Sequence, residues 1–177
     1  AFNDWERKAN PDKETSAYAG SVNANVSVSN VTAQIGENAV VKAGSDLNVK
    51  ANVDNITVNE AGAVSANGKT GGGGAIVTDV SVNDAIASIG SNASVDAKRN
   101  MLLDANQDYV VVQAGVGAAV AKSTSGAGTV GVLVQTNNTK SLIGEGAKIN
   151  QTYKDDKADE NQTVSLNAKN KNVIVKG

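Results

Sequence analysis

Hydrophobic and polar residues alternate along much of this chain. In residues 21–28, the apolar side chains of Val22, Ala24, Val26 and Val28 alternate with Ser and Asn. Strict alternation of this kind is typical of a β-strand with one buried face. No segment shows a convincing amphipathic helical face with apolar residues spaced every 3.6 positions. The pattern therefore predicts an all-β protein.

The same pattern recurs at a fixed interval along the chain, and its clearest marker is an Ile-Gly pair at 35–36, 89–90 and 143–144. The interval between these pairs is 54 residues. A fixed period of this length is the signature of a stacked repeat architecture. Seven columns of equivalent residues keep this register, and the Ile and the Gly of the pair are two of them. The other five are Gly20/Gly74/Gly128, Val22/Ile76/Val130, Val26/Val80/Val134, Ala39/Ala93/Ala147 and Val41/Val95/Ile149.

The constant period favours a β-solenoid over a sandwich or barrel of meandering strands. In a sandwich nothing forces equal spacing, whereas in a solenoid each residue lies beneath its equivalent one repeat later. We expect about five short strands in each repeat, separated by turns of Gly, Asn, Asp and Ser. A 54-residue repeat of about two coils, each of about 27 residues, fits the usual size of such coils. Columns of Val, Ile and Leu are expected inside, with Asn, Thr and Ser outside.

The repeats divide the chain into four segments. The first is a non-repeat N-terminal stretch or loop, and repeats 1, 2 and 3 follow, at 1–15, 16–73, 74–127 and 128–177. The third repeat is truncated, and we expect the chain to be a piece of a longer repetitive protein. It also carries a nine-residue insert near 153–161, since the strand that begins at Val164 matches Leu47 and Met101 only after nine extra positions.

The insert is the one candidate contact site, because insertions in a solenoid form loops that protrude from its surface. Its charged residues could instead serve only to keep a loop solvated, and calcium binding by its carboxylates is a further alternative. These residues are Lys154, Asp155, Asp156, Lys157, Asp159 and Glu160.

Composition excludes several kinds of function. The net charge of −2 gives no basic field for nucleic acid. The chain has no His and no Cys, which removes Ser-His-Asp and Cys-His nucleophiles and most zinc sites. We therefore expect no enzyme, no cofactor and no metal. A carboxylate pair that cleaves polysaccharide is the remaining catalytic alternative.

The longest apolar run, Val110–Ala121, is about a dozen residues and is shorter than the roughly 20 of a membrane-spanning helix. We expect it to be a tightly packed interior strand. A membrane-active segment of a toxin is the alternative.

The motif Ile-Gly-x-x-Ala-x-Val followed by Leu-x-Val-x-Ala resembles the repeats of large secreted bacterial adhesins. These are filamentous-haemagglutinin-like proteins of two-partner secretion and related autotransporter passengers. Residues 132–149 are similar to repeats of leukotoxin-type adhesins, and the resemblance covers Ser16 to Gly177. It implies a right-handed parallel β-helix that is secreted or held at the surface of a Gram-negative bacterium.

The expected function is that of a structural repeat segment in such an adhesin, a rigid rod that presents loops to host cells. Its partners would be a host receptor or matrix protein, of unknown identity, and an outer-membrane transporter during secretion. The alternatives are a leukotoxin segment that damages host cells and, less favoured by the sequence, a polysaccharide-processing β-helix enzyme.

Overall fold

The structure is a computed structural model that describes residues 16–151 and 162–177. Within these residues every regular element is a strand, which confirms the all-β prediction. The strands are β1 (Ser16–Ile35), β2 (Val40–Ala43), β3 (Leu47–Ile89), β4 (Ser94–Ala97), β5 (Met101–Ile143), β6 (Lys148–Ile149) and β7 (Val164–Lys176).

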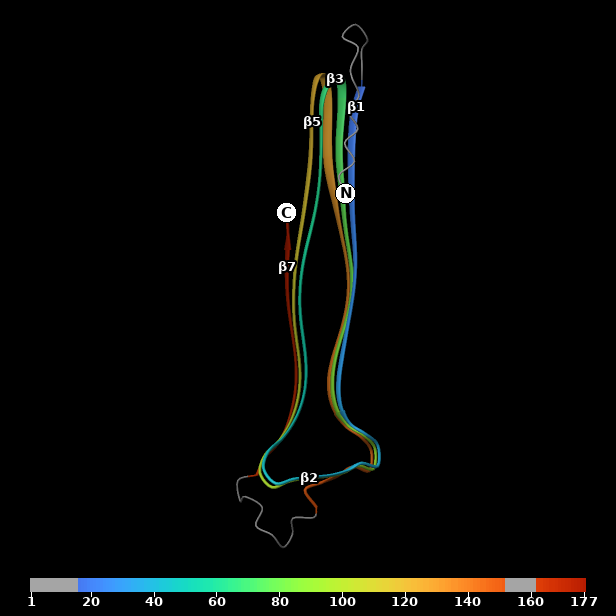
Figure 1. Ribbon diagram of the computed structural model, residues 1–177. Helices are drawn as coiled ribbons and strands as arrows, with labels where there is room; N and C mark the ends of the chain where they lie inside the picture. Colours follow the sequence, from blue (N-terminus) through green and yellow to red (C-terminus); the bar gives the residue numbers. More distant parts are fainter. Residues whose placement is uncertain (1–15, 152–161) are drawn as a thin grey trace.

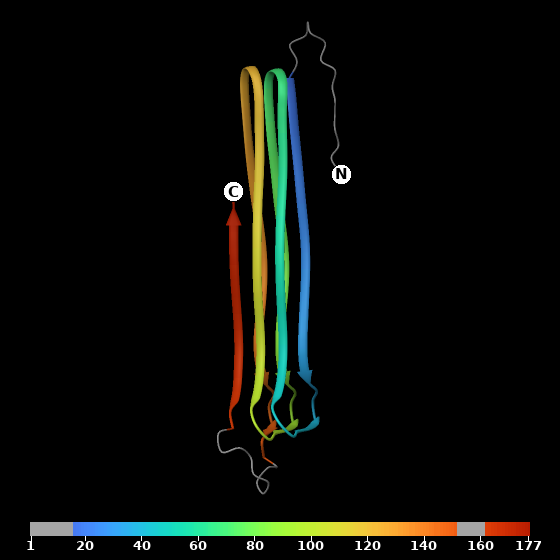
Figure 2. The ribbon, with the colours of Figure 1, turned by 60° about the vertical axis from the view of Figure 1, so that its left-hand side comes forward.

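Two of these elements are far longer than the short strands expected from the sequence. β3 and β5 each rise from the base of the molecule, turn back at its far end and return (Figure 1, Figure 2). We call residues 47–65 and 101–119 the outgoing legs, and residues 70–89 and 124–143 the return legs. β1 lies beside the return legs and β7 beside the outgoing legs. The short strands cross the base.

All strand pairs are parallel. The long strands form a sheet in the order β1-β3-β5-β7, and the short ones a sheet in the order β2-β4-β6. Val22 pairs with Ile76, which pairs with Val130, so hydrogen-bonded neighbours are one full repeat apart in the sequence. The expectation of two coils in each repeat is therefore wrong. The two legs are so long that one winding, the path from one short strand to the next, uses the whole repeat.

The nine-residue offset expected in the third repeat is confirmed in the pairing of β7. Met101 pairs with Val164, nine positions beyond the regular spacing, and this offset continues to the pair of Gln113 with Lys176. The parallel ladder therefore resumes after the extra residues without losing its register. The extra residues themselves fall almost entirely in 152–161, outside the described part of the chain.

The Ile-Gly marker lies where the return leg turns into the base. Asn38 and Asn92 follow it at positive φ (57° and 56°), as a type II turn requires at its third position. Successive turns stack closely, and Gly90 N of one turn donates a hydrogen bond to Ile35 O of the turn before it at 2.8 Å. A Cβ on Gly90 would lie 2.5 Å from Glu37 N, whereas one on Gly36 would meet nothing within 4 Å. Glycine is thus required where one turn lies on another.

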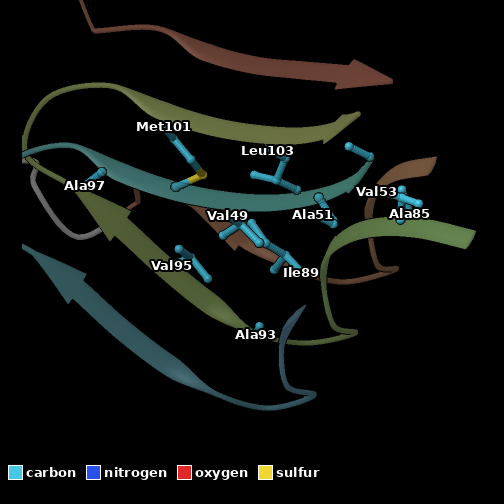
Figure 3. Close-up of a cluster of buried hydrophobic side chains, with 12 residues drawn as sticks. Val49, Ala51, Val53, Ala85, Ile89, Ala93, Val95, Ala97, Met101 and Leu103 are labelled. Carbon is cyan, nitrogen blue, oxygen red and sulfur yellow. The ribbon is translucent and has the colours of Figure 1, made fainter. Parts of the chain in front are cut away.

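An apolar core lies at the base, between the ends of the two legs and the short strands (Figure 3). Ile89 is 1% exposed and pairs with Ile35 and Ile143, as the sequence predicted. Most of the other members are Ala or Val, so neighbouring windings can pack at strand spacing. They are Val49, Ala51, Val53, Ala85, Ala87, Ala93, Val95, Ala97, Met101, Leu103 and Ala105.

Beyond this core much of the interior of the legs is polar, although Val77, Tyr109 and Val111 are also buried there. The polar part reverses the sequence prediction for residues 22–28. Val22 and Val26 are 72% exposed, and the Ser and Asn residues that alternate with them, at 21, 23, 25 and 27, point inward. In the next winding the inward residues are Asn55, Thr57 and Asn59 on the outgoing leg and Asp79, Ser81 and Asn83 on the return leg.

Hydrogen bonds between inward amides, along one leg and across the two legs, satisfy part of this polar interior. Asn55 Nδ2 donates to Asn83 Oδ1 at 3.2 Å, Asn83 Nδ2 to Asn137 Oδ1 at 3.0 Å, and Asn137 Nδ2 to Asn172 Oδ1 at 3.0 Å. Each side-chain amide uses its donor on the next acceptor, so the ladder crosses from winding to winding. Buried polar groups that are hydrogen-bonded in this way escape most of the desolvation penalty.

Toward the far end the legs pack through small residues. Ala61, Ala75 and Val77 form a second apolar cluster there. A Cβ on Gly73 would lie 2.3 Å from Ala118 O, and one on Gly117 would lie 2.8 Å from Gly128 O. Backbones of opposite legs therefore approach too closely for larger side chains.

The apolar core predicts a matched pair of isoleucine substitutions. Ile89→Ala should lower the free energy of unfolding by about 2–5 kcal/mol, because it leaves a cavity between stacked neighbours. Ile56→Ala, at a side chain that is 75% exposed, should change it by no more than about 0.5 kcal/mol. Urea titrations of both variants would measure the difference, and equal effects would contradict the assigned faces.

The stacked turns predict a matched pair of glycine substitutions. Gly90→Ala should destabilise the protein clearly, because its new methyl group would press on the backbone of Glu37. Gly36→Ala places the same group in open space at the equivalent position of the preceding winding. Thermal unfolding of the two variants should separate them, and a Gly36→Ala variant that loses as much stability as Gly90→Ala would refute the stacking explanation.

Candidate functional site

The charged residues that the sequence nominated as a contact loop lie outside the described residues. They are Lys154, Asp155, Asp156, Lys157, Asp159 and Glu160. Their role stays a prediction. The structure adds that the ladder on either side of them is continuous with its neighbours.

The described residues also bear on the catalytic and membrane alternatives. Among residues 16–151 and 162–177, no three His, Cys, Asp or Glu side chains gather as a metal site. The same part of the chain holds no helix long and apolar enough to cross a membrane. The run Val110–Ala121 belongs to β5, where Val111 is fully buried but Val116 and Val120 are more than 60% exposed. It is thus only partly the interior strand that we expected.

The surface feature that the sequence reasoning missed is an apolar face on the return legs. We define this outer apolar face by the outward residues of three paired strands. None of these residues is charged. They are Gly20, Val22, Ala24, Val26 and Val28 on β1, Gly74, Ile76, Thr78, Val80 and Val82 on β3, and Gly128, Val130, Val132, Val134 and Thr136 on β5.

The outer apolar face is hollowed along its glycine column. Gly20, Gly74 and Gly128 lie side by side, and a Cβ on Gly20 or Gly128 would meet nothing within 4 Å. Beside them the column Val22, Ile76 and Val130 forms a ridge. Together they line an open groove of about 440 Å³ that runs across the strands. Contiguous apolar surface of this kind marks sites of association.

The outgoing legs carry a narrower set of outward apolar residues. Ile56 pairs with Val110 and Val110 with Val173, and the next outward column is Val58, Val112 and Val175. Ile56 and Val58 are exposed, whereas Val110 and Val112 in the middle winding are half-buried by their neighbours. Stacking thus shields part of each column.

The clearest ion pair in the described residues lies at a corner of the base. Asp46 Oδ1 accepts hydrogen bonds from Arg99 Nε at 3.1 Å and from the backbone N of Asn100 at 3.0 Å. The hydrogen bond from Arg99 lowers the pKa of Asp46, and that from Asn100 adds to the shift. This pairing of adjacent windings is present above the ordinary pKa of Asp and is lost as the pH falls through the lowered one. The pair is exposed to solvent, so it contributes little to stability.

No protein-family model, curated protein or solved structure matches this chain. The candidate site therefore rests on its geometry alone.

The inward and outward faces of the return leg predict opposite responses to the same substitution. Val26→Thr, on the outer apolar face, should change the free energy of unfolding by no more than about 0.5 kcal/mol. Val77→Thr, at an inward side chain that is 1% exposed, buries a hydroxyl and should cost about 1–3 kcal/mol. Denaturant titration measures both, and a larger loss for Val26→Thr would show that Val26 faces inward.

Proposed function

We propose that this chain is a structural repeat segment of a secreted bacterial surface adhesin, folded as a right-handed parallel β-helix. Its work is to extend a rigid rod from the cell and to present surface to host cells. The carrying observation is the parallel pairing of equivalent residues in successive repeats from β1 through β5, continued by β7. A chain whose neighbours are its own equivalents can be lengthened by adding windings.

The distribution of side chains supports a binding role over a catalytic one. Many polar side chains of the legs point inward, and the amides of Asn55, Asn83, Asn137 and Asn172 hydrogen-bond to one another between legs and windings. The residues of the outer apolar face are uncharged and mostly apolar, and these suit the contact surface of a partner. The partner would be a receptor or matrix protein of the host, and export would use an outer-membrane transporter.

A second candidate function is a direct part in damage to host cells, as in a leukotoxin. The observation that favours it is the same outer apolar face, because an uncharged apolar surface can also adsorb to lipid.

The deciding experiment adds the purified, fluorescently labelled chain to host epithelial cells and leukocytes. The adhesin proposal expects saturable binding without release of cytosolic enzyme. Release at binding concentrations would favour the toxin, and an absence of binding would contradict the adhesin.

Deletion of residues 153–161 tests the predicted contact loop. Binding should weaken while the circular dichroism spectrum and the unfolding midpoint stay nearly unchanged, since loop length costs little entropy.

The outer apolar face has its own variant in this assay. A chain with both Val22→Thr and Val26→Thr keeps the fold and removes apolar surface from one strand of the face. If binding uses the face, the double variant should bind more weakly than the parent chain. Ile56→Ala, on the outgoing leg, is the matched control.

A further inference from the structure

The outer apolar face carries no charge, whereas the outward side of the outgoing legs is charged. Toward the base the face ends at the polar column Asn30, Asp84 and Asn138, in which Asn138 Nδ2 donates to Asp84 Oδ1 at 2.9 Å. A partner that covers the face therefore needs an uncharged apolar surface of its own, because an unpaired charge buried against it would be costly. The charged outward residues of the outgoing legs are Lys50, Asp54, Glu60, Asp104, Asp108, Lys169 and Lys171.

The relief of the face is complementary to itself when the strand direction is reversed. Along β3, Gly74 marks the groove at one end of the face, Val82 the opposite end and Thr78 the middle, and β1 and β5 continue these columns in register. A two-fold axis in the plane of the face, perpendicular to the strands at Thr78, would lay the Val82 end of each copy over the Gly74 groove of the other. A surface that fits its own copy in this way can form a closed, isologous dimer.

The extent of the face is sufficient for a weak dimer. Three strands with five outward positions each give a footprint of roughly 500 Å², so two copies would cover about 1,000 Å² in total, near the lower limit of specific interfaces. Val22, Val26 and Val130 are each more than half exposed and would lose most of that exposure. Each further winding would add one more strand to the face, so the interface would grow with the number of repeats.

We propose that the outer apolar face pairs with the same face of a second copy of this chain, with the strands of the two copies antiparallel. The face has no charge, so the copies do not repel each other there, and sheets that pack face to face lie about 10 Å apart. The two-fold axis is parallel to the direction in which windings are added. The two rods therefore run side by side in the same direction, and both could extend from one cell surface. This pairing does not depend on the adhesin role, because it concerns only the chain and its copy.

Chemical cross-linking tests the geometry, and the chain has no cysteine of its own. Thr78→Cys lies on the two-fold axis, opposite itself in the second copy, so a short bis-maleimide reagent should join two such chains. Val82→Cys lies on the same strand and the same face. The axis places its copy opposite Gly74, about 27 Å away along the strand direction, so it should stay unlinked. Val58→Cys, on the outward side of the outgoing leg, is a second control. Denaturing electrophoresis separates linked from unlinked chains.

Sedimentation equilibrium tests the association itself. The weight-average mass of the unmodified chain should rise with concentration from one chain toward two. Val26→Lys places a charge within the paired faces and should raise the dissociation constant at least about tenfold. Val58→Lys adds the same charge on the outgoing leg and should leave the dissociation constant unchanged.

Four outcomes would overturn the proposal. They are a mass that stays at one chain at every concentration, a mass that climbs past two chains, a Val26→Lys variant that associates as well as the unmodified chain, and a Thr78→Cys variant that links no better than Val82→Cys. The second and third would point to pairing through the open strand edges instead. Both experiments use the isolated protein, so a failure here leaves the binding to host cells to be decided by its own assay.

Discussion

The interaction on which the rest of this structure depends is the parallel pairing of each residue with its equivalent in the next repeat. It fixes more than the backbone ladder, because every side chain then stacks on its own equivalent at strand spacing. A side chain that fits the interior of one winding can therefore pack on the same residue type in the next. The bond from Asn83 Nδ2 to Asn137 Oδ1 is the clearest instance, because the two residues are equivalents in adjacent windings.

The same constraint explains the most regular motif of the sequence. Gly90 and Gly144 lie where one turn rests on the turn before it, and a Cβ on either would lie 2.5 Å from a backbone nitrogen. The preceding isoleucine anchors the turn in the core at the base, as the burial of Ile89 shows. Extra residues are tolerated only where they leave the ladder intact, and the pairing of Met101 with Val164 resumes the register in this way.

The sequence was sufficient to predict the all-β class, the burial of Ile89 and the offset of β7. It was not sufficient to predict which face of the return leg points inward. Alternation gives a period of two but no direction, and the usual assumption that Val is inside fails when Asn and Ser can pair across windings. The number of coils in each repeat was predicted wrongly because residue types that are typical of turns also occur inside the long strands. Asp79, Asn83 and the glycines at 71–74 look like turn residues, yet each lies within a continuous paired strand. For the candidate site, the glycine groove was visible only as a column in the sequence, because its depth depends on the outward direction of Val22, Ile76 and Val130.

The base and the legs of each winding are stabilised in different ways, and the outer surface of the legs remains available to partners. The base holds the main apolar core, whereas the legs combine backbone pairing, interior amides and close glycine contacts with a few buried side chains such as Tyr109 and Val111. Because the legs take so few apolar side chains into their interior, their Val and Ile residues are left on the outside. In an isolated globular domain such an arrangement would forgo the stabilisation that comes from burying apolar side chains. In a stacked chain the ladder supplies the order, and the apolar columns on the outside are free to contact another surface.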